Sequence, residues 1–461
     1  MITLDLTAFS YAMAVVVTYY LVLYLLGAAG VSVPPIATEK RPLVVIVIPA
    51  HNEEIVLDHT LQAALGVAYS GSLRILVVDD ASTDHTGEIA GRVAAAEDRV
   101  RVLRRGVDIG GRGKSEVLNH AYTQLSSWHA ARDPWLERRL VSSIVLCILD
   151  ADGRLSPRAL QDATAFFCSR RVGAVQVGVK IRNARESMLA RMQDIEFVGF
   201  SFMVQTARDR LGSVGLGGNG QFTRMSALAV LGARPWAPDA LTEDLDLGLR
   251  LRMAGWRLRF CSTAWVDQQG LTRLRPLLRQ RTRWAQGHYQ CWRHIPAVLR
   301  CRRLRFVSRL DILAYLVLIA MVLVVTAVIG VRVLDSFGIL TATNTFLGGL
   351  GSGVVFRTVI LTLSWLPLWL TIATYQRYAV DSLRWWEWPT YCVLFAAYVY
   401  LWAIATVRAW ARAAMRRGNW VKTPRTTNGE CYESARGTPV WESAAPTAII
   451  PRVDAEVLTD A

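Results

Sequence analysis

Charged residues are scarce in this sequence, at 19% of its 461 positions, whereas hydrophobic residues make up 52%. Acidic residues are the scarcer sign, because 37 Asp and Glu face 52 Lys and Arg, for a formal net charge of +15. So few charges exclude a disordered polyampholyte and are atypical of a soluble domain. Basic nucleic-acid-binding proteins are rarely so apolar. The composition favours a membrane protein whose positive charges flank its spans.

Several common signatures of metal and nucleotide sites are also missing. The seven cysteines include no Cys-x-x-Cys pair, so the sequence encodes neither a disulfide framework nor a zinc site. Gly110–Ser115 resembles part of a phosphate-binding P-loop, but that motif needs a glycine where this chain has Asp108. Ordinary hydrogen-bonded roles are expected for four histidines without metal-ligand spacing, which are His51, His85, His120 and His288.

Long apolar runs predict segments that cross a membrane. Residues 6–31 are uncharged and long enough for a hydrocarbon core of about 30 Å. They lack the basic start and short apolar core of a cleaved signal peptide, so we expect a retained anchor. Lys40 and Arg41 then place the following segment on the cytoplasmic side. A C-terminal membrane region is expected over 310–410, with spans at Ile312–Gly330, Thr358–Tyr375 and Trp388–Val407.

The topology of the C-terminal part stays open. Phe337–Val355 is uncharged but rich in Gly and Thr, so it could be a loop, a re-entrant segment or a poor span. Three spans would place the tail, residues 411–461, outside, yet six positive charges between Arg408 and Arg425 favour the inside. We expect an inside tail, which is disordered after Gly429.

Residues 266–308 form a densely basic and aromatic segment that includes Trp284 and Trp292. A solvated charged helix would not need the Leu and Trp that alternate with the arginines. The pattern therefore predicts one or two amphipathic helices that lie on an anionic membrane face.

The segment 42–265 is expected to be a cytoplasmic α/β domain. Polar stretches with helical spacing, such as Glu53–Leu65 and Thr86–Ala95, separate its short apolar runs. Strands that alternate with helices predict a mostly parallel sheet, in which ligands bind beyond the carboxyl ends of the strands. The predicted buried strands are Leu43–Ile48, Leu73–Val78, Val100–Leu103 and Ile144–Leu149.

Acidic clusters fall where such a sheet would bind its ligand. One pair of acids after a strand is ordinary turn or cap chemistry, but three clusters at successive strand ends converge on one cleft. A fourth cluster precedes a helix-like stretch, Leu245–Met253. The clusters are Pro49-Ala50-His51-Asn52-Glu53-Glu54, Asp79-Asp80, Asp150-Ala151-Asp152 and Thr242-Glu243-Asp244.

The Asp-x-Asp pair Asp150 and Asp152 suits a divalent ion shared with phosphate oxygens. Mg²⁺ and Mn²⁺ prefer hard oxygen ligands and keep open positions for substrate, and such an ion neutralises the charge that develops on a diphosphate leaving group. A further carboxylate could act as general base for an acceptor hydroxyl. Asp79 and Asp80 lie too early in the sheet for that task and suit hydrogen bonds to a base or a ribose.

In this order the motifs closely resemble those of the membrane-embedded family-2 glycosyltransferases, which include cellulose, hyaluronan and poly-N-acetylglucosamine synthases. The resemblance covers about 42–300, with a weaker similarity at Trp420–Arg425, and its most specific part is Gln280-Arg281-Thr282-Arg283-Trp284. It implies a GT-A-like nucleotide-sugar-binding sheet embedded between transmembrane helices, in the plasma (inner) membrane, with the catalytic domain cytoplasmic.

The resemblance also implies a role for each motif residue. Ala50, Glu53 and Asp79 would contact the uridine with Asp80 beside them, and Lys114 would lie near the nucleotide. Asp150 and Asp152 would hold Mg²⁺ or Mn²⁺ and the diphosphate, and Asp244, next to Glu243, would be the general base. Gln280, Arg283 and Trp284 would bind diphosphate and acceptor sugar, because Arg offers a fork for phosphate oxygens and an aromatic face stacks on a sugar.

The activity implied is inverting, metal-dependent transfer of a sugar from a UDP-sugar to a growing polysaccharide. The run Gly217–Phe222 and the sequence Arg283–Tyr289 also resemble enzymes that put one glucose on diacylglycerol, so a glycolipid product is the alternative. Gly215–Phe222 itself could be a flexible turn or line the acceptor site. A transporter would carry ionisable residues inside its spans, and a non-catalytic scaffold has no use for clustered like charges, so both are distant alternatives.

Overall fold

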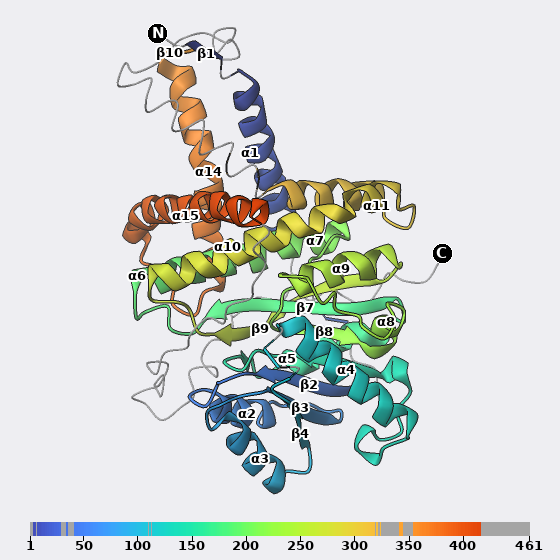
Figure 1. Ribbon diagram of the computed structural model, residues 1–461. Coiled ribbons are helices and arrows are strands. Elements are labelled where there is room, and N and C mark those ends of the chain that lie inside the picture. The colour runs from blue at the N-terminus through green and yellow to red at the C-terminus, as the bar shows by residue number, and fades with distance from the viewer. Residues whose placement is uncertain are drawn as a thin grey trace, which may run out of the picture.

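The computed structural model describes residues 3–5, 7–28, 34–35, 41–108, 110–111, 113–318, 320, 323, 341–343 and 354–415. An eight-stranded sheet lies at the centre, in the order β4-β3-β2-β5-β8-β7-β9-β6 (Figure 1). A separate two-stranded parallel sheet joins β1 (Thr3–Asp5) to β10 (Thr341–Thr343), far from the large sheet. The large sheet therefore positions the predicted site.

The first four strands of the large sheet confirm the predicted apolar runs and are parallel to one another. Nearly all of their apolar side chains are buried, as expected of parallel strands covered by helices on both faces. β3 and β4 each continue two residues beyond the predicted run, because Asp79 and Asp80 lie opposite Arg104 and Arg105 in the register. The strands are β2 (Leu43–Ala50), β3 (Leu73–Asp80), β4 (Val100–Arg105) and β5 (Ile144–Ile148).

The other half of the sheet makes it mixed, where the sequence predicted a mostly parallel sheet. β8 (Gln221–Arg224) is antiparallel to both β5 and β7 (Val172–Ile181). The reason is local: the chain enters β8 beside the carboxyl end of β5, so it has to run back along it. β9 (Arg257–Gln268) is parallel to β7, and β6 (Arg154–Leu155) is antiparallel to β9.

Helices cover both faces of the sheet, with a separate apolar core on each side. One face is covered by α2 (Leu57–Leu65), α3 (Thr86–Ala96) and α5 (Ala159–Ala165). The helix predicted from Glu53 begins only at Leu57, since the preceding residues form bends and turns. The other face is covered by α4 (Lys114–Ala130), α8 (Met225–Ala229) and α9 (Glu243–Met253).

A second helical layer lies above the edge formed by β7 and β9 (Figure 1). α6 (Met188–Gly199) continues through a π-helical turn, Phe200–Gln205, into α7 (Thr206–Leu211). α10 (Leu274–Cys291) and α15 (Trp388–Ala414) lie side by side in this layer, with Ala285 packed on Ala409. α11 (Ile295–Arg300) and a helix over 306–318 follow α10. α1 (Thr7–Ala28) and α14 (Val354–Tyr378) project away from this layer.

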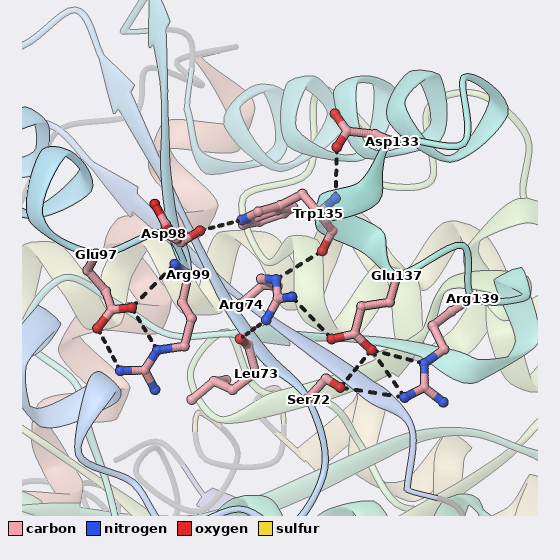
Figure 2. A network of polar contacts seen from close by, with 10 residues as sticks. All are labelled: Ser72, Leu73, Arg74, Glu97, Asp98, Arg99, Asp133, Trp135, Glu137 and Arg139. Carbon is pink, nitrogen blue, oxygen red and sulfur yellow. Dashed lines mark hydrogen bonds and ion pairs between the residues drawn. The ribbon is translucent and has the colours of Figure 1, made fainter.

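The amino ends of β3 and β4 are fixed by a polar network (Figure 2). Arg74 pairs with Glu137 at 3.1 Å and donates to the Trp135 carbonyl, and the Trp135 indole N–H donates to the Asp98 carbonyl. These contacts join the strands to the turn after α4, which includes the 3-10 helix Pro134–Leu136. The network lies at the opposite end of the strands from Asp79, Asp80 and Asp150, so it is structural.

Among the described residues, one helical stretch is long and apolar enough to cross a membrane, Trp385–Ala414, and a third of its apolar window is buried. Ala14–Ala28 is a shorter apolar helix. α14 covers the predicted span Thr358–Tyr375, although its side chains are described only from Trp365. More than half of Ile312–Gly330, most of Phe337–Val355 and the tail from 416 lie outside the described residues.

Candidate active site

A cavity of about 770 Å³ opens where the parallel strands end and reaches up to α1, α14 and α15. Eleven of the twelve residues predicted for the site line this cavity, so one space connects the predicted nucleotide, metal and acceptor residues. Asp79 is the exception. The eleven are Ala50, Glu53, Asp80, Lys114, Asp150, Asp152, Glu243, Asp244, Gln280, Arg283 and Trp284.

The end of the cavity predicted to bind the nucleotide is formed by the ends of β2 and β3. Ala50 is the last residue of β2, and the Glu53 backbone N–H donates to Thr86 Oγ1 at 2.7 Å. Asp80 is buried and forms an ion pair with Arg105, and its second carboxylate oxygen accepts from the Gly111 N–H at 3.1 Å. The Asp80 carboxylate therefore fixes the loop that leads to α4.

Asp79, which does not line the cavity, closes the turn after β3. Its Oδ1 accepts from the Ser82 N–H at 3.0 Å, and its Oδ2 lies where a side chain on Gly87 would start, 2.7 Å from an ideal Cβ. Gly87 lies in the first turn of α3. Because glycine has no side chain, α3 can lie closer to the Asp79 carboxylate than it could with a larger residue at this position. The direct contact with a uridine predicted for Asp79 stays a prediction.

Lys114 is the centre of an acidic cluster. It is the first residue of α4, and Gly113 before it has φ 104°, a conformation that favours glycine. The Lys114 ammonium donates to Asp150 and to the Gly218 carbonyl at 2.6 Å, and lies 3.8 Å from Glu243 Oε1. Burial alone would lower the pKa of Lys114, but the Asp150 and Glu243 carboxylates outweigh burial and raise it above its usual value.

Asp244 lies on the other side of the same cluster, at the first turn of α9. Burial and the neighbouring Glu243 carboxylate raise the pKa of Asp244 to about 7. The backbone N–H of Leu245 and the cations Lys114 and Arg283 lower this pKa, but by less than burial and Glu243 raise it. A carboxylate with a pKa near neutrality is matched to general base catalysis.

The glycine-rich segment before β8 forms part of the cavity wall, and its predicted contact with the acceptor stays a prediction. A side chain on Gly218 would start 3.1 Å from Lys114 Nζ and 3.3 Å from Asp244 Oδ2, so glycine keeps this space open. Asn219 Oδ1 accepts from the Asp150 N–H at 3.1 Å, and its amide donates to Gln268 at 3.0 Å. The segment therefore orients Asp150.

Asp150 and Asp152 differ in exposure. The Asp150 side chain is 29% exposed, whereas Asp152 is 2% exposed and one of its oxygens accepts from the Gln269 N–H at 3.0 Å. In the part of the chain that the structure describes, no group of three or more His, Cys, Asp or Glu is arranged to hold a metal ion. Two cavity-lining carboxylates still fit Mg²⁺ or Mn²⁺ if substrate phosphates complete the coordination.

α10 contributes the third part of the site. Arg283 Nη1 donates to the Leu241 carbonyl at 3.0 Å, and Gln280, Arg283 and Trp284 all line the cavity. The Trp284 ring stands edge-on to Phe197, with centroids 6.0 Å apart, and 6.4 Å from the Trp402 ring. The motif therefore faces the space above Lys114 and Asp244.

Three further residues near Trp284 line the cavity and were not predicted from the sequence. They are Glu196, Phe197 and Trp402. Glu196 and Phe197 belong to α6, and Trp402 belongs to α15, which the sequence predicted as a span. One signal was available, since Glu196 is an acidic residue beside an apolar run. His288 behaves as expected: burial lowers its pKa to about 4, and it contacts the Trp284 carbonyl at 3.2 Å.

This arrangement defines the class of protein. Lys114, Asp150 and Asp244 surround one point beyond the ends of a GT-A-like sheet, and residues 41–287 match the family described as Glycosyltransferase like family 2. Because that match covers more than half of the chain, the chain belongs to this family.

Two curated relatives illustrate the range of the family. The chain is 33% identical over 251 residues to beta-monoglucosyldiacylglycerol synthase of Nostoc sp., covering 54% of this chain and 49% of that protein. It is 26% identical over 263 residues to poly-beta-1,6-N-acetyl-D-glucosamine synthase of Staphylococcus aureus, covering 56% of this chain and 57% of that protein. The chain therefore spans about half the length of these relatives, which include a glycolipid synthase and a polysaccharide synthase.

A solved structure supports the fold. The mannosyltransferase PcManGT from Pyrobaculum calidifontis, in complex with GDP-Man and Mn²⁺, matches 86% of this chain and 98% of its own, with a TM-score of 0.56 and 18% identity. At that identity the likeness concerns the fold alone, which agrees with the GT-A-like sheet.

Proposed function

We propose that this protein is a membrane-bound inverting β-glycosyltransferase that moves a sugar from a UDP-sugar to a growing polysaccharide. One observation carries the proposal. Asp244, with a pKa of about 7, lies in the same cavity as the Lys114–Asp150 pair, below Trp284. A base, a diphosphate-side cation and an aromatic sugar platform are the parts that such a transfer requires.

In the proposed reaction, Asp244 takes the proton of the acceptor hydroxyl as its oxygen attacks the anomeric carbon. The new carbon–oxygen bond forms as the bond to the diphosphate breaks, so UDP leaves and the configuration inverts. Arg283, in the same cavity wall, binds the diphosphate oxygens, and Lys114 can do so once it turns from Asp150. Ala50, Glu53 and Asp80 hold the nucleoside end, with Asp79 behind them.

A divalent ion is part of the proposal, with Asp150 and Asp152 as its protein ligands. Mg²⁺ or Mn²⁺ supplies neutralisation of the charge that develops on the leaving diphosphate. Both carboxylates line the cavity, and the Mn²⁺ in the P. calidifontis complex supports the use of a divalent ion. Asp150 is the more accessible ligand, and Asp152 is oriented by the Gln269 N–H.

A specific observation favours the second candidate, transfer of one sugar to a membrane lipid. The upper wall of the cavity is built from apolar residues of α1, α14, α15 and the helix over 306–318. An acyl chain would pack against these apolar side chains, whereas a polysaccharide would stack its sugar rings on aromatic side chains. The relevant residues are Val16, Tyr20, Leu318, Trp365, Leu368 and Val399.

Membrane location is part of the proposal, and the placement of the same helices supports it. Thr341–Thr343 pairs with Thr3–Asp5 at the far end of α1, so the chain has moved away from the catalytic part after the helix over 306–318. α14 then returns, and its Tyr375 donates to Asp194 of α6 at 2.8 Å. This supports two crossings of the membrane between 312 and 378, with the catalytic part cytoplasmic.

α15 stays on the catalytic side in this topology. Its residues from Tyr398 to Trp410 contact α10 from Arg281 to Tyr289 in the same order. In this proposal α15 lies lengthwise on α10 and does not cross, although it is long and apolar enough to do so, and the tail is then inside.

Incubation of the purified protein in lipid with a panel of UDP-sugars and Mg²⁺ or Mn²⁺ tests the proposal. The mass of the product separates polymer from glycolipid. Absence of transfer from every donor, by protein that is folded and in lipid, would contradict the proposed activity.

A further inference from the structure

Arg281, the second residue of the Gln-x-x-Arg-Trp motif, lies at a buried junction of three helices. It is 1% exposed and does not line the cavity, unlike Gln280, Arg283 and Trp284 around it. A guanidinium without access to the cavity cannot bind substrate. Its burial requires another explanation, since a buried charge is costly unless it is paired.

Arg281 contacts both of the motif residues that face the acceptor side. Its Nη1 donates to Gln280 Oε1 at 2.9 Å, and its guanidinium carbon lies 4.2 Å from the centre of the Trp284 ring. Residues three apart on a helix share a face, which explains the stacking on Trp284. Only Arg combines a planar stacking surface with several donors in fixed directions.

The other side of Arg281 is held by Glu196 and Tyr398. Arg281 Nη2 donates to Glu196 Oε2 at 2.5 Å and to Tyr398 Oη at 3.1 Å. The Tyr398 hydroxyl also donates to Glu196 Oε2, at 2.5 Å. Trp402 Nε1 donates to the other oxygen, Glu196 Oε1, at 2.8 Å. Both carboxylate oxygens are thus used, and the set joins α6, α10 and α15.

We propose that Arg281, Glu196 and Tyr398 are positioning residues that fix the Trp284 ring and the Gln280 amide for the acceptor. This inference deepens the proposed function and rests on it for the role of Trp284. It makes α15 a structural part of the acceptor site, because Tyr398 and Trp402 hold Glu196 against Arg281. Movement of α15 would then change acceptor binding before it changed donor binding.

Tyr398→Phe is the sharpest test, and the chain offers a matched control. Tyr375→Phe also removes one hydroxyl that donates to an α6 carboxylate, that of Asp194, but this carboxylate accepts from the Ile181 N–H, whereas Glu196 accepts from Arg281. The KM for acceptor is measured with dioleoylglycerol in liposomes or a β-linked oligosaccharide, whichever the wild type uses. Because a displacement of 1 Å can cost about 10²-fold, we expect a rise of about 10-fold or more for Tyr398→Phe. UDP affinity should stay at the wild-type value, and Tyr375→Phe should change neither quantity.

A double-mutant cycle separates positioning from stability. If Arg281 acts through the indole, Arg281→Lys should raise the acceptor KM in the wild type and add little in a Trp284→Ala background. Equal effects of Arg281→Lys in both backgrounds, or equal effects of Tyr398→Phe and Tyr375→Phe, would overturn the proposal.

A spectroscopic readout keeps the inference testable even if no transfer is detected. The Trp284 and Trp402 rings are 6.4 Å apart, so their near-ultraviolet circular dichroism depends on their mutual orientation. Trp284→Phe removes the part of the near-ultraviolet circular dichroism that comes from the Trp284–Trp402 pair. The same part of the signal should be lost in Tyr398→Phe and kept in Tyr375→Phe. Its retention in Tyr398→Phe would refute the positioning role, whereas inactivity of the wild type would refute only the proposed function.

Discussion

The Lys114 ammonium lies 3.8 Å from the Glu243 carboxylate, although 128 intervening residues separate the two. Lys114 also donates to Asp150 on its other side. One cation thus links the carboxylate proposed for metal with the acidic pair that contains the proposed base. Because Lys114 contacts both sides, a change of charge at Asp150 can alter the position of Lys114 and with it the pKa of Asp244.

Replacement of Lys114 by Met should move the acidic limb of the pH–rate profile to higher pH. Lys114 is one of the cations that lower the pKa of Asp244, so its loss should raise that pKa further. The profile of kcat under saturating substrates measures the shift. An unmoved limb with reduced kcat would mean that Lys114 acts on the donor alone.

Activity of the wild type should rise through neutral pH and approach a plateau above it. The deprotonated form of Asp244 is the base, and its pKa is about 7. Stability should follow the opposite sign. The folded-state pKa lies above the unfolded value, so this contribution is complete below about pH 4 and lost as the pH rises through about 7.

This loss of stability should be weaker in Asp244→Asn, which cannot titrate. Denaturant unfolding of both proteins at pH 5 and pH 8 measures the difference. Identical changes between the two pH values would contradict the raised pKa of Asp244.

Asp152→Ala should weaken metal-dependent binding of the UDP-sugar, because one of two proposed hard ligands is lost. Titration of the donor with and without Mn²⁺ measures the effect. We expect the metal-dependent gain to shrink while metal-free binding stays unchanged. If the wild type kept its activity in EDTA, the proposal that Asp150 and Asp152 bind a metal ion would be contradicted.

Met415, the described residue that follows α15 directly, tests the topology. Met415→Cys in an otherwise cysteine-free chain should react with a membrane-impermeant thiol reagent only after the cells are opened. Met415 is exposed, so the thiol would be accessible on whichever side it lies. Labelling of intact cells would place α15 across the membrane and the tail outside.

The apolar runs allowed β2 to β5 to be predicted, because β2, β3 and β5 are buried on both faces and β4 is still short and apolar enough to read as a strand. β7 and β9 could not be read in the same way, since Lys180 and Asp267 interrupt their apolar pattern and lie opposite each other in the sheet. Opposite charges in register are compatible with a strand, but a single sequence cannot show which residues become neighbours.

The same limit applies to the site. The sequence predicted Asp150 as an acidic residue after a strand, because strand order alone brings such ends together. Asp244 precedes a helix instead, and its predicted role as base came from the family resemblance. The residues around Trp284 could not be predicted, because they are distant from it in the sequence. Glu196 belongs to α6, well before α10, and Trp402 belongs to α15, well after it. The sequence assigned Trp388–Val407 to a span by its apolar composition, and α15 is long and apolar enough to cross a membrane, with a third of its apolar window buried. Its contact with α10 through Ala285 and Ala409 could not be predicted from the sequence.

The most direct test of the account is UDP-sugar transfer by the wild type and by Asp244→Asn, with UDP binding measured on the same preparations. Removal of a general base costs about 10²–10⁴-fold in rate, whereas Asn keeps the size and hydrogen bonding of Asp. We predict a loss of kcat in that range with UDP affinity near the wild-type value. Turnover within a few-fold of wild type would show that Asp244 is not the base and would contradict the proposed mechanism.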